Sequence, residues 1–97
     1  MAYVVVAKWT ARDGEEERVL EAIAKLTGQS RREPGCLLYQ PTRSLEDPRV
    51  FLIFEIYADE AGYQAHAESD HFQTYGFGDA IPRLADRERT FYETIDV

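Results

Sequence analysis

The stretch 50–57 constrains the fold most, because it is apolar on both sides of an extended chain. In a β-strand, successive side chains point to opposite faces of the sheet. One face would carry Val50, Leu52, Phe54 and Ile56, and the other would carry Phe51, Ile53, Glu55 and Tyr57. A sheet with one face in water alternates apolar and polar residues. This strand therefore predicts a sheet that is covered on both faces, with Glu55 as a lone buried charge.

Four stretches predict strands, because they are rich in β-branched and aromatic residues. They are residues 3–9, 36–42, 49–57 and 87–95. The segment 44–48 between the second and the third contains turn residues. These two strands are therefore predicted to form an antiparallel hairpin.

Two longer helices are predicted between the strands. Apolar residues at helical spacing indicate a helix from residue 15 to about residue 32, which Pro34-Gly35 would end. A second helix is predicted over 59–68, with Asp59 as its N-cap.

The region after the second helix predicts a short helix over 69–75, capped by Ser69 and ended by Gly76-Phe77-Gly78. One further turn is predicted at 80–84. The order of elements is then β-α-β-β-α-β. It predicts a single α+β domain over residues 1–97, ferredoxin-like, with one antiparallel sheet and its helices on one face.

The helices of such a fold cover one face of the sheet, yet the other face of strand 49–57 is also apolar. The first strand has the same character, with Val4 and Val6 opposing Val5 and Ala7. An exposed apolar face of this size calls for a partner. The simplest partner is a second copy of the sheet, which predicts a symmetric homodimer.

Charge and cysteine content exclude several classes of function. The formal net charge is -7, so nucleic acid and anionic membrane are poor partners. The single cysteine, Cys36, cannot form an intramolecular disulfide, and it is expected to be a packing residue rather than a nucleophile. That count suits the cytoplasm. The apolar stretch 3–7 is too short for a signal or a membrane span.

Both histidines of the chain, His66 and His71, follow the strand that contains Glu55. His66 is the first candidate for a general base, or for a donor to a substrate oxygen, because histidine titrates near neutral pH. Glu55 needs a partner if it is buried, and a contact with His66 would orient that base. The structural alternatives are a histidine that braces the interface through Glu55, and a salt bridge from Glu55 to an arginine of the last strand.

His71 and Phe72 form a weaker part of the candidate site. Residues five apart on one helix lie about 140° from each other, so His66 and His71 can share a pocket only if the helix breaks near Ser69. A metal site made of His66, His71 and Asp70 is conceivable, but the spacing is not that of a zinc motif. We therefore expect no metal and no cofactor.

Aromatic residues could line a pocket for a flat phenolic ligand. Taken singly, each is better explained as a core or interface residue, and it is the set together that suggests a pocket. The candidates are Trp9, Tyr39, Tyr57, Tyr63 and Tyr75.

Three segments resemble the antibiotic biosynthesis monooxygenase family: residues 32–37 (REPGCL), 51–57 (FLIFEIY) and 65–72 (AHAESDHF). The resemblance covers nearly the whole chain. It implies a dimeric α+β barrel and a pocket between sheet and helices. It also implies oxidation of aromatic substrates such as quinols and polyketide anthrones by molecular oxygen, without flavin or metal. The chain has no asparagine, which weakens a likeness to haem-degrading members and to some anthrone oxygenases.

The predicted function is that of a cofactor-free monooxygenase acting on a small aromatic compound with molecular oxygen. Its catalytic residues are His66 and Glu55. Its substrate-binding residues are His71, Phe72, Trp9, Tyr39, Tyr57, Tyr63 and Tyr75. One alternative is an acid–base isomerase of a small metabolite, with Arg43, Arg83 and Arg87 as candidates to hold a phosphate. The other is a module that binds an aromatic compound without catalysis.

Overall fold

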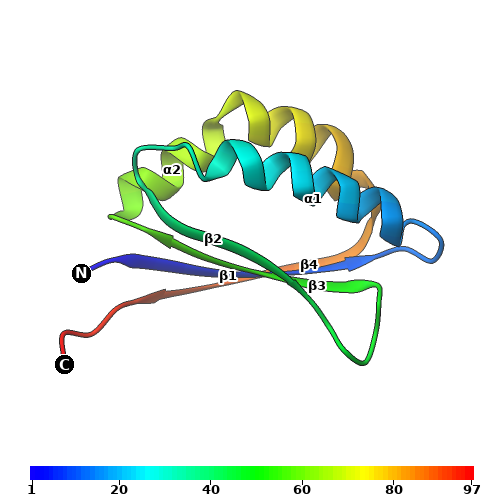
Figure 1. Cartoon of the computed structure of the whole chain (residues 1–97), viewed down its shortest axis with the longest axis horizontal. Coiled ribbons are helices and arrows are strands. Elements are labelled where there is room, and N and C mark those ends of the chain that lie inside the picture. The colour runs from blue at the N-terminus through cyan, green and yellow to red at the C-terminus, as the bar shows by residue number, and fades with distance from the viewer.

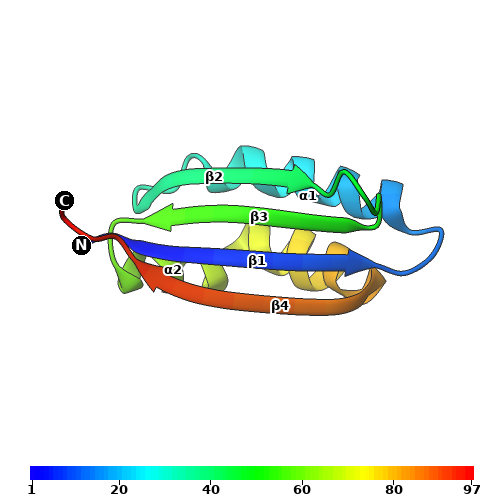
Figure 2. The same cartoon turned by 90° about the horizontal axis from the view of Figure 1, so that it is seen from below.

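Four antiparallel strands form one sheet in the computed structural model, which describes residues 1–97. The strands are β1 (Tyr3–Ala11), β2 (Cys36–Arg43), β3 (Val50–Tyr57) and β4 (Leu84–Glu93). Their order across the sheet is β2-β3-β1-β4, and all helices lie on one face (Figures 1 and 2). This arrangement confirms the predicted ferredoxin-like fold, including the β2–β3 hairpin.

Helix α1 (Glu16–Ser30) packs on the sheet through Val19, Ile23 and Leu26. The prediction that it extends to about residue 32 is wrong. The chain leaves the helix after Ser30 and forms a turn, in which the N–H of Glu33 donates to Ser30 O (3.1 Å) and the N–H of Cys36 donates to Glu33 O (3.1 Å). This turn places Glu33 beneath the end of α1.

Helix α2 (Glu60–Glu68) begins as predicted, because the side chain of Asp59 accepts a hydrogen bond from the N–H of Gly62 at 2.9 Å. A π-helix, η1 (Phe72–Ala80), follows α2 (Figure 1). It continues through Gly76-Phe77-Gly78, where the sequence predicted a break. Glycine lowers helix propensity, but tertiary packing overrides it here, because Gly76 is buried against the ring of Phe72.

The end of η1 passes into a short 3-10 turn, η2 (Ile81–Arg83), in agreement with the predicted turn at 80–84. Strand β4 then begins at Leu84, three residues earlier than predicted, because Leu84 pairs with Ala11 across a bulge in β4, where Ala85 is the extra residue. It ends at Glu93, two residues earlier than predicted.

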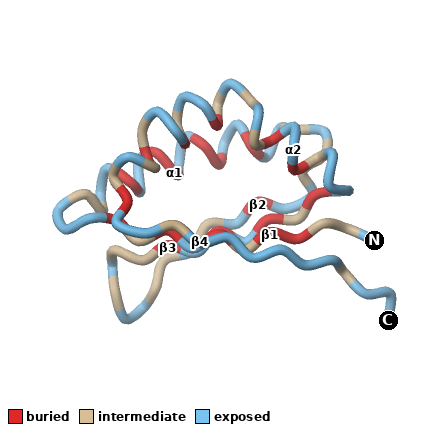
Figure 3. Tube along the Cα trace, turned by 180° about the vertical axis from the view of Figure 1, so that it is seen from behind, coloured by how far each residue is buried: buried red, intermediate tan, exposed pale blue.

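The face of the sheet beneath the helices forms the core. Register pairs Val5 with Glu55 and Trp9 with Phe51 across β1 and β3, and all four are buried. Figure 3 shows the buried positions of helices and strands facing each other across this layer. Glu55 is therefore a carboxylate on the inner face of the sheet, as its position in the strand predicted.

The opposite face of the sheet has no helix over it (Figure 2). Its apolar side chains include Leu38, Leu52, Phe54 and Tyr92, which are 39%, 36%, 37% and 58% exposed. We call this surface the open face. Its composition agrees with the expected apolar character, and the homodimer stays a prediction. None of the helices is both long and apolar enough to cross a bilayer.

Candidate active site

His66 is enclosed by aromatic rings on the inner face of α2. Its side chain is 2% exposed. The ring centroids of Tyr39, Tyr57 and Phe72 lie 5.5, 5.5 and 5.0 Å from that of the imidazole. Such a ring must find partners for its nitrogen atoms within the protein, because buried polar atoms without partners are costly.

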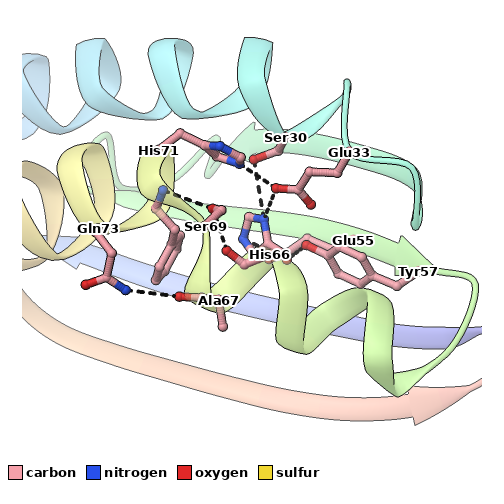
Figure 4. Close-up of polar contacts among 10 residues, drawn as sticks. Ser30, Glu33, Glu55, Tyr57, His66, Ala67, Ser69, His71 and Gln73 are labelled. Carbon is pink, nitrogen blue, oxygen red and sulfur yellow. Dashed lines mark hydrogen bonds and ion pairs between the residues drawn. The ribbon is translucent and has the colours of Figure 1, made fainter.

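Glu33 is the partner that binds His66. Its Oε2 lies 2.9 Å from His66 Nδ1 and 2.5 Å from His71 Nε2 (Figure 4). Glu33 comes from the turn after α1, His66 from α2 and His71 from the start of the next helical segment. One carboxylate oxygen thus joins three elements. We call Glu33, His66 and His71 the triad.

The triad determines which nitrogen atom of His66 is free. An ionised carboxylate only accepts hydrogen bonds, so His66 donates to it through Nδ1–H, and His71 through Nε2–H. In the neutral form of His66, which carries one N–H, Nε2 is then an acceptor. This atom lies 3.9 Å from Glu55 Oε1.

A break in the chain at Ser69 brings both histidines to one carboxylate. Ser69 is extended, with ψ of 153°, between α2 and the following helical segment. Its hydroxyl donates to His66 O (2.7 Å) and accepts from the N–H of Phe72 (3.2 Å). The helix therefore breaks at Ser69, as it had to if His66 and His71 were to lie close together.

Glu55 is buried beside His66 but does not hydrogen-bond to it. Its Oε1 accepts instead from the hydroxyl of Tyr57 at 2.6 Å. Burial raises the pKa of Glu55 to about 7, although the Tyr57 hydrogen bond and the nearby His66 oppose this. Glu33, and not Glu55, makes the hydrogen bond that orients His66. Glu55 provides a carboxyl group that can exchange a proton near neutral pH.

A small cavity lies against His66 and Glu55. Its volume is about 40 Å³. Its walls come from the sheet, α2, η1 and β4, and consist of Ala7, Trp9, Tyr39, Glu55, Tyr63, His66, Ala67, Phe72, Phe77, Arg87 and Arg89. A histidine, a protonatable carboxyl group and aromatic rings thus share one small space, which is an arrangement suited to proton transfer.

Comparison with known proteins identifies the family. The model of the antibiotic biosynthesis monooxygenases matches residues 2–76. The chain belongs to the antibiotic biosynthesis monooxygenase (ABM) family. The resemblance read from the sequence is thereby confirmed. A search of curated proteins found no match.

Solved structures with the ABM fold align with nearly the whole chain. A Nitrosomonas europaea protein with the provisional designation antibiotic biosynthesis monooxygenase is 26% identical, with TM-score 0.92 over 97% of this chain and 90% of its own. A protein from Shewanella oneidensis is 29% identical, with TM-score 0.87 over 94% and 88%. A conserved protein from Methanosarcina mazei is 25% identical, with TM-score 0.90 over 98% and 94%.

The predicted site residues of this ABM protein divide into two groups. Trp9, Tyr39, Tyr63 and Phe72 line the cavity with His66 and Glu55. Three others lie outside its lining. Tyr57 is buried behind Glu55, while His71 and Tyr75 border a separate open groove near Gln29 and Asp70.

Several residues at the ABM site were missed from the sequence. Glu33 entered the sequence analysis only within the segment 32–37, and Arg87 only as a candidate for binding phosphate. Arg89 donates to the hydroxyl of Tyr63 at 2.8 Å, and Phe77 packs edge-on against Phe72 with centroids 5.2 Å apart. The alternation along β4 could have revealed the arginines, because 87, 89 and 91 share one face.

The triad is also the one place where His and carboxylate ligands could hold a metal, since its three ligand atoms lie within 4.8 Å of one another. Two ligands of a tetrahedral zinc ion would stand roughly 3.3 Å apart, given bonds of about 2.0 Å. The contacts of 2.9 and 2.5 Å to Glu33 are instead those of hydrogen bonds. The acid that joins the histidines is Glu33 and not Asp70.

Two other features of this ABM protein, a groove between α1 and β2 and the thiol of Cys36, are poorer candidates for a catalytic site. A groove of about 390 Å³ between α1 and β2 contains Ile23, Arg31 and Phe51, but no histidine and no carboxylate. Cys36 is half-buried, and burial raises the pKa of its thiol to about 11. A thiol of this kind is a poor nucleophile at neutral pH, which suits a packing residue.

Proposed function

We propose that this protein is a cofactor-independent monooxygenase that oxidises a small quinol or related polyphenol with molecular oxygen. The observation that carries the proposal is the orientation of His66. Its Nδ1–H is held by Glu33, so Nε2 is an acceptor toward Glu55, where both residues line the cavity. Membership of the ABM family supports the reaction class.

The proposed chemistry begins with proton transfer. His66 Nε2 takes the proton of a phenolic hydroxyl, and the carboxylate of Glu33 stabilises the imidazolium that forms. The phenolate is a stronger reductant than the phenol and passes an electron to dioxygen. One oxygen atom enters the ring and the other leaves as water, so a quinol becomes a hydroxyquinone. The substrate supplies every electron that reduces dioxygen.

The size of the cavity indicates how substrate enters. A volume of about 40 Å³ is well below the roughly 150 Å³ of a cavity that holds benzene. Side chains at the mouth must therefore move when a ring binds. The candidates are Phe77, which is 48% exposed, and the exposed Arg89.

Oxygen consumption tests the proposal. Protein treated with chelator would be assayed against a panel of quinols and anthrones, with autoxidation subtracted. Wild type and the control Gln64→Ala, on the exposed side of α2, should consume oxygen. His66→Ala should lose roughly 100-fold or more, the usual contribution of a general base. Full activity of His66→Ala would contradict the role of His66.

An acid–base isomerase is the second candidate. One of its predicted phosphate-binding residues, Arg87, does line the cavity. The other two are engaged elsewhere: Arg43 pairs with Glu17, and Arg83 pairs with Glu15 and Asp79. Turnover that continues without oxygen would favour this candidate. Binding of a phenol without any product would instead favour a non-catalytic module.

We also propose a homodimer assembled through the open face, and a cytoplasmic location. The apolar side chains of that face support the first proposal. The single thiol, which suits a reducing compartment, supports the second.

A further inference from the structure

Two of the residues that line the cavity each have a buried N–H group without an acceptor in the protein. These groups are Nε1 of Trp9 and Nε of Arg87, and both atoms are buried. Buried donors are almost always paired with an acceptor, so an unpaired one needs an explanation. Here two such donors belong to residues that line the same cavity.

Their positions follow from the register of the sheet. Trp9 of β1 lies directly opposite Arg87 of β4, so the two side chains stand next to each other on the inner face. His66 and Glu55 line the same small space. The two donors thus border the place where the proposed base acts.

Arg87 is also a charged group without a counterion. Its side chain makes no ion pair or hydrogen bond, while Arg43, Arg49 and Arg83 all pair with carboxylates. The guanidinium carbon lies 6.0 and 5.6 Å from the ring centroids of Phe72 and Phe77. Burial lowers the pKa of Arg87 below its ordinary value. A half-buried cation in this setting is stabilised by an anion.

The charged groups around the cavity favour a negative ligand. Arg87 and Arg89 contribute two positive charges, and Glu55 is the one carboxyl group on the wall. The pKa of Glu55 is about 7, so this group is substantially neutral at and below neutral pH. His66 becomes positive once it has accepted a proton.

We propose that Trp9 and Arg87 form a subsite for a small anion, which holds a negatively charged oxygen atom beside His66. The volume of about 40 Å³ accommodates an anion of two or three atoms. Binding of the anion does not depend on the proposed function, whereas the role of the subsite in turnover rests on it. In the proposed reaction the charged oxygen belongs either to superoxide, formed when dioxygen accepts one electron, or to the phenolate of the substrate. Donors aimed at developing negative charge are a common source of catalysis.

Binding of azide tests the subsite directly. Trp9 is the only tryptophan, so a ¹⁵N-labelled sample gives a single indole N–H resonance. Sodium azide, titrated at constant ionic strength, should shift this resonance with saturation. Arg87→Met should weaken binding about ten-fold or more. Arg18→Met, which removes an equal charge from the exposed side of α1, should bind azide as wild type does.

Either of two results would overturn the subsite: no saturable shift in wild type, or an equal affinity in Arg87→Met. Trp9→Phe provides a second check, because it removes the N–H and retains an aromatic ring. Azide binding to Trp9→Phe would be followed by the backbone amide resonances of Ala7 and Ala67 and should also be weakened. Unchanged affinity would remove Trp9 from the subsite. Thermal melting would establish that each variant is folded.

Steady-state kinetics distinguishes the two sources of the charged oxygen. If the subsite holds superoxide, Arg87→Met should lower kcat/KM for oxygen and leave KM for the quinol unchanged. If it holds the phenolate, KM for the quinol should rise. Azide binding without any oxygen consumption would refute the proposed function while supporting the subsite.

Discussion

Glu33 organises the candidate site through a single oxygen atom, which accepts from both histidines. Its other oxygen, Oε1, is buried without a partner in the protein. The shorter of the two hydrogen-bond contacts of His66 Nδ1 is thus made by a residue in a turn, while Ser30 Oγ lies 3.5 Å away. The contact with both histidines makes the carboxylate more informative to substitute than either imidazole.

Glu33→Gln should reduce oxygen consumption roughly 100-fold, because an amide can present its NH₂ to His66 and favour the other tautomer. The ¹⁵N shifts of the imidazole nitrogens report the tautomer without any substrate. Glu21→Gln, on the exposed side of α1, is the matched control. A Glu33→Gln variant that keeps both the activity and the Nδ1–H tautomer would show that Glu33 does not orient His66.

Glu55 makes the stability of the protein depend on pH. Its pKa is about 7 in the folded state against an ordinary 4.5, so the folded protein binds this proton more tightly than the unfolded chain. The contribution of Glu55 to the free energy of unfolding should therefore fall as pH rises from about 4.5 to 7. The total loss is about 3 kcal/mol, as an upper limit.

Urea unfolding at several pH values tests this sign. Glu55→Gln cannot ionise, so wild type should become less stable relative to this variant across that range. If the free energies of unfolding of wild type and Glu55→Gln changed with pH in parallel, Glu55 would have the same pKa in the folded and unfolded states.

At this scale the sequence singled out His66 and Glu55 as candidates, but not Glu33. His66 and Glu55 stand out because one is among two histidines and the other is the only charge in an apolar strand. Glu33 is one of 18 acidic residues and follows two arginines in a polar turn. Glu33 differs from the other acidic residues only in the folded protein, where its turn packs against α2 and the helical segment that follows α2.

Among the elements, the helical segment after Ser69 departs most from its prediction. Two glycines indicated a break, yet the π-helix passes through them. Helix propensity takes into account only that Gly76 lacks a side chain. In the structure, the ring of Phe72 packs against Gly76 in the space that a side chain would occupy. The strands were predicted more closely because their apolar patterns report burial directly.

Gly76→Ala should destabilise the fold by about 1–2 kcal/mol, since its Cβ would lie 3.1 Å from the Phe72 ring in a packed layer. Gly28→Ala is the matched control, because a Cβ there meets nothing within 4 Å in α1. That change should be stabilising by up to about 1 kcal/mol. Urea unfolding measures both, and equal effects would contradict the packing argument.

For the whole molecule, the β-α-β-β-α-β order and the placement of all helices on one face of the sheet could be predicted from the sequence patterns of the single elements. The apolar character of the open face could be predicted from the side-chain alternation in β3. The cavity could not be predicted in the same way. Its wall combines β1, β2, β3, α2, η1 and β4, and its size depends on how side chains from all of them pack.

Phe54→Glu should convert the proposed dimer to a monomer, because it places a charge at the centre of the open face. Sedimentation velocity would measure the change in mass. Leu45→Glu introduces the same charge at a fully exposed position between β2 and β3, and should leave assembly unchanged. A wild-type protein that sediments as a monomer at micromolar concentration would refute the dimer.

Phe54 and Glu55 are neighbours in the chain but lie on opposite sides of β3. A single step along this strand leads from the surface proposed for self-association to the wall of the candidate active site. Evolution or an engineer could therefore alter assembly at even-numbered positions of β3 and acid–base chemistry at odd-numbered ones, with little interference between them. Because of the same alternation, a one-residue slip in the register of β3 would exchange the two surfaces and abolish both self-association and the acid–base site.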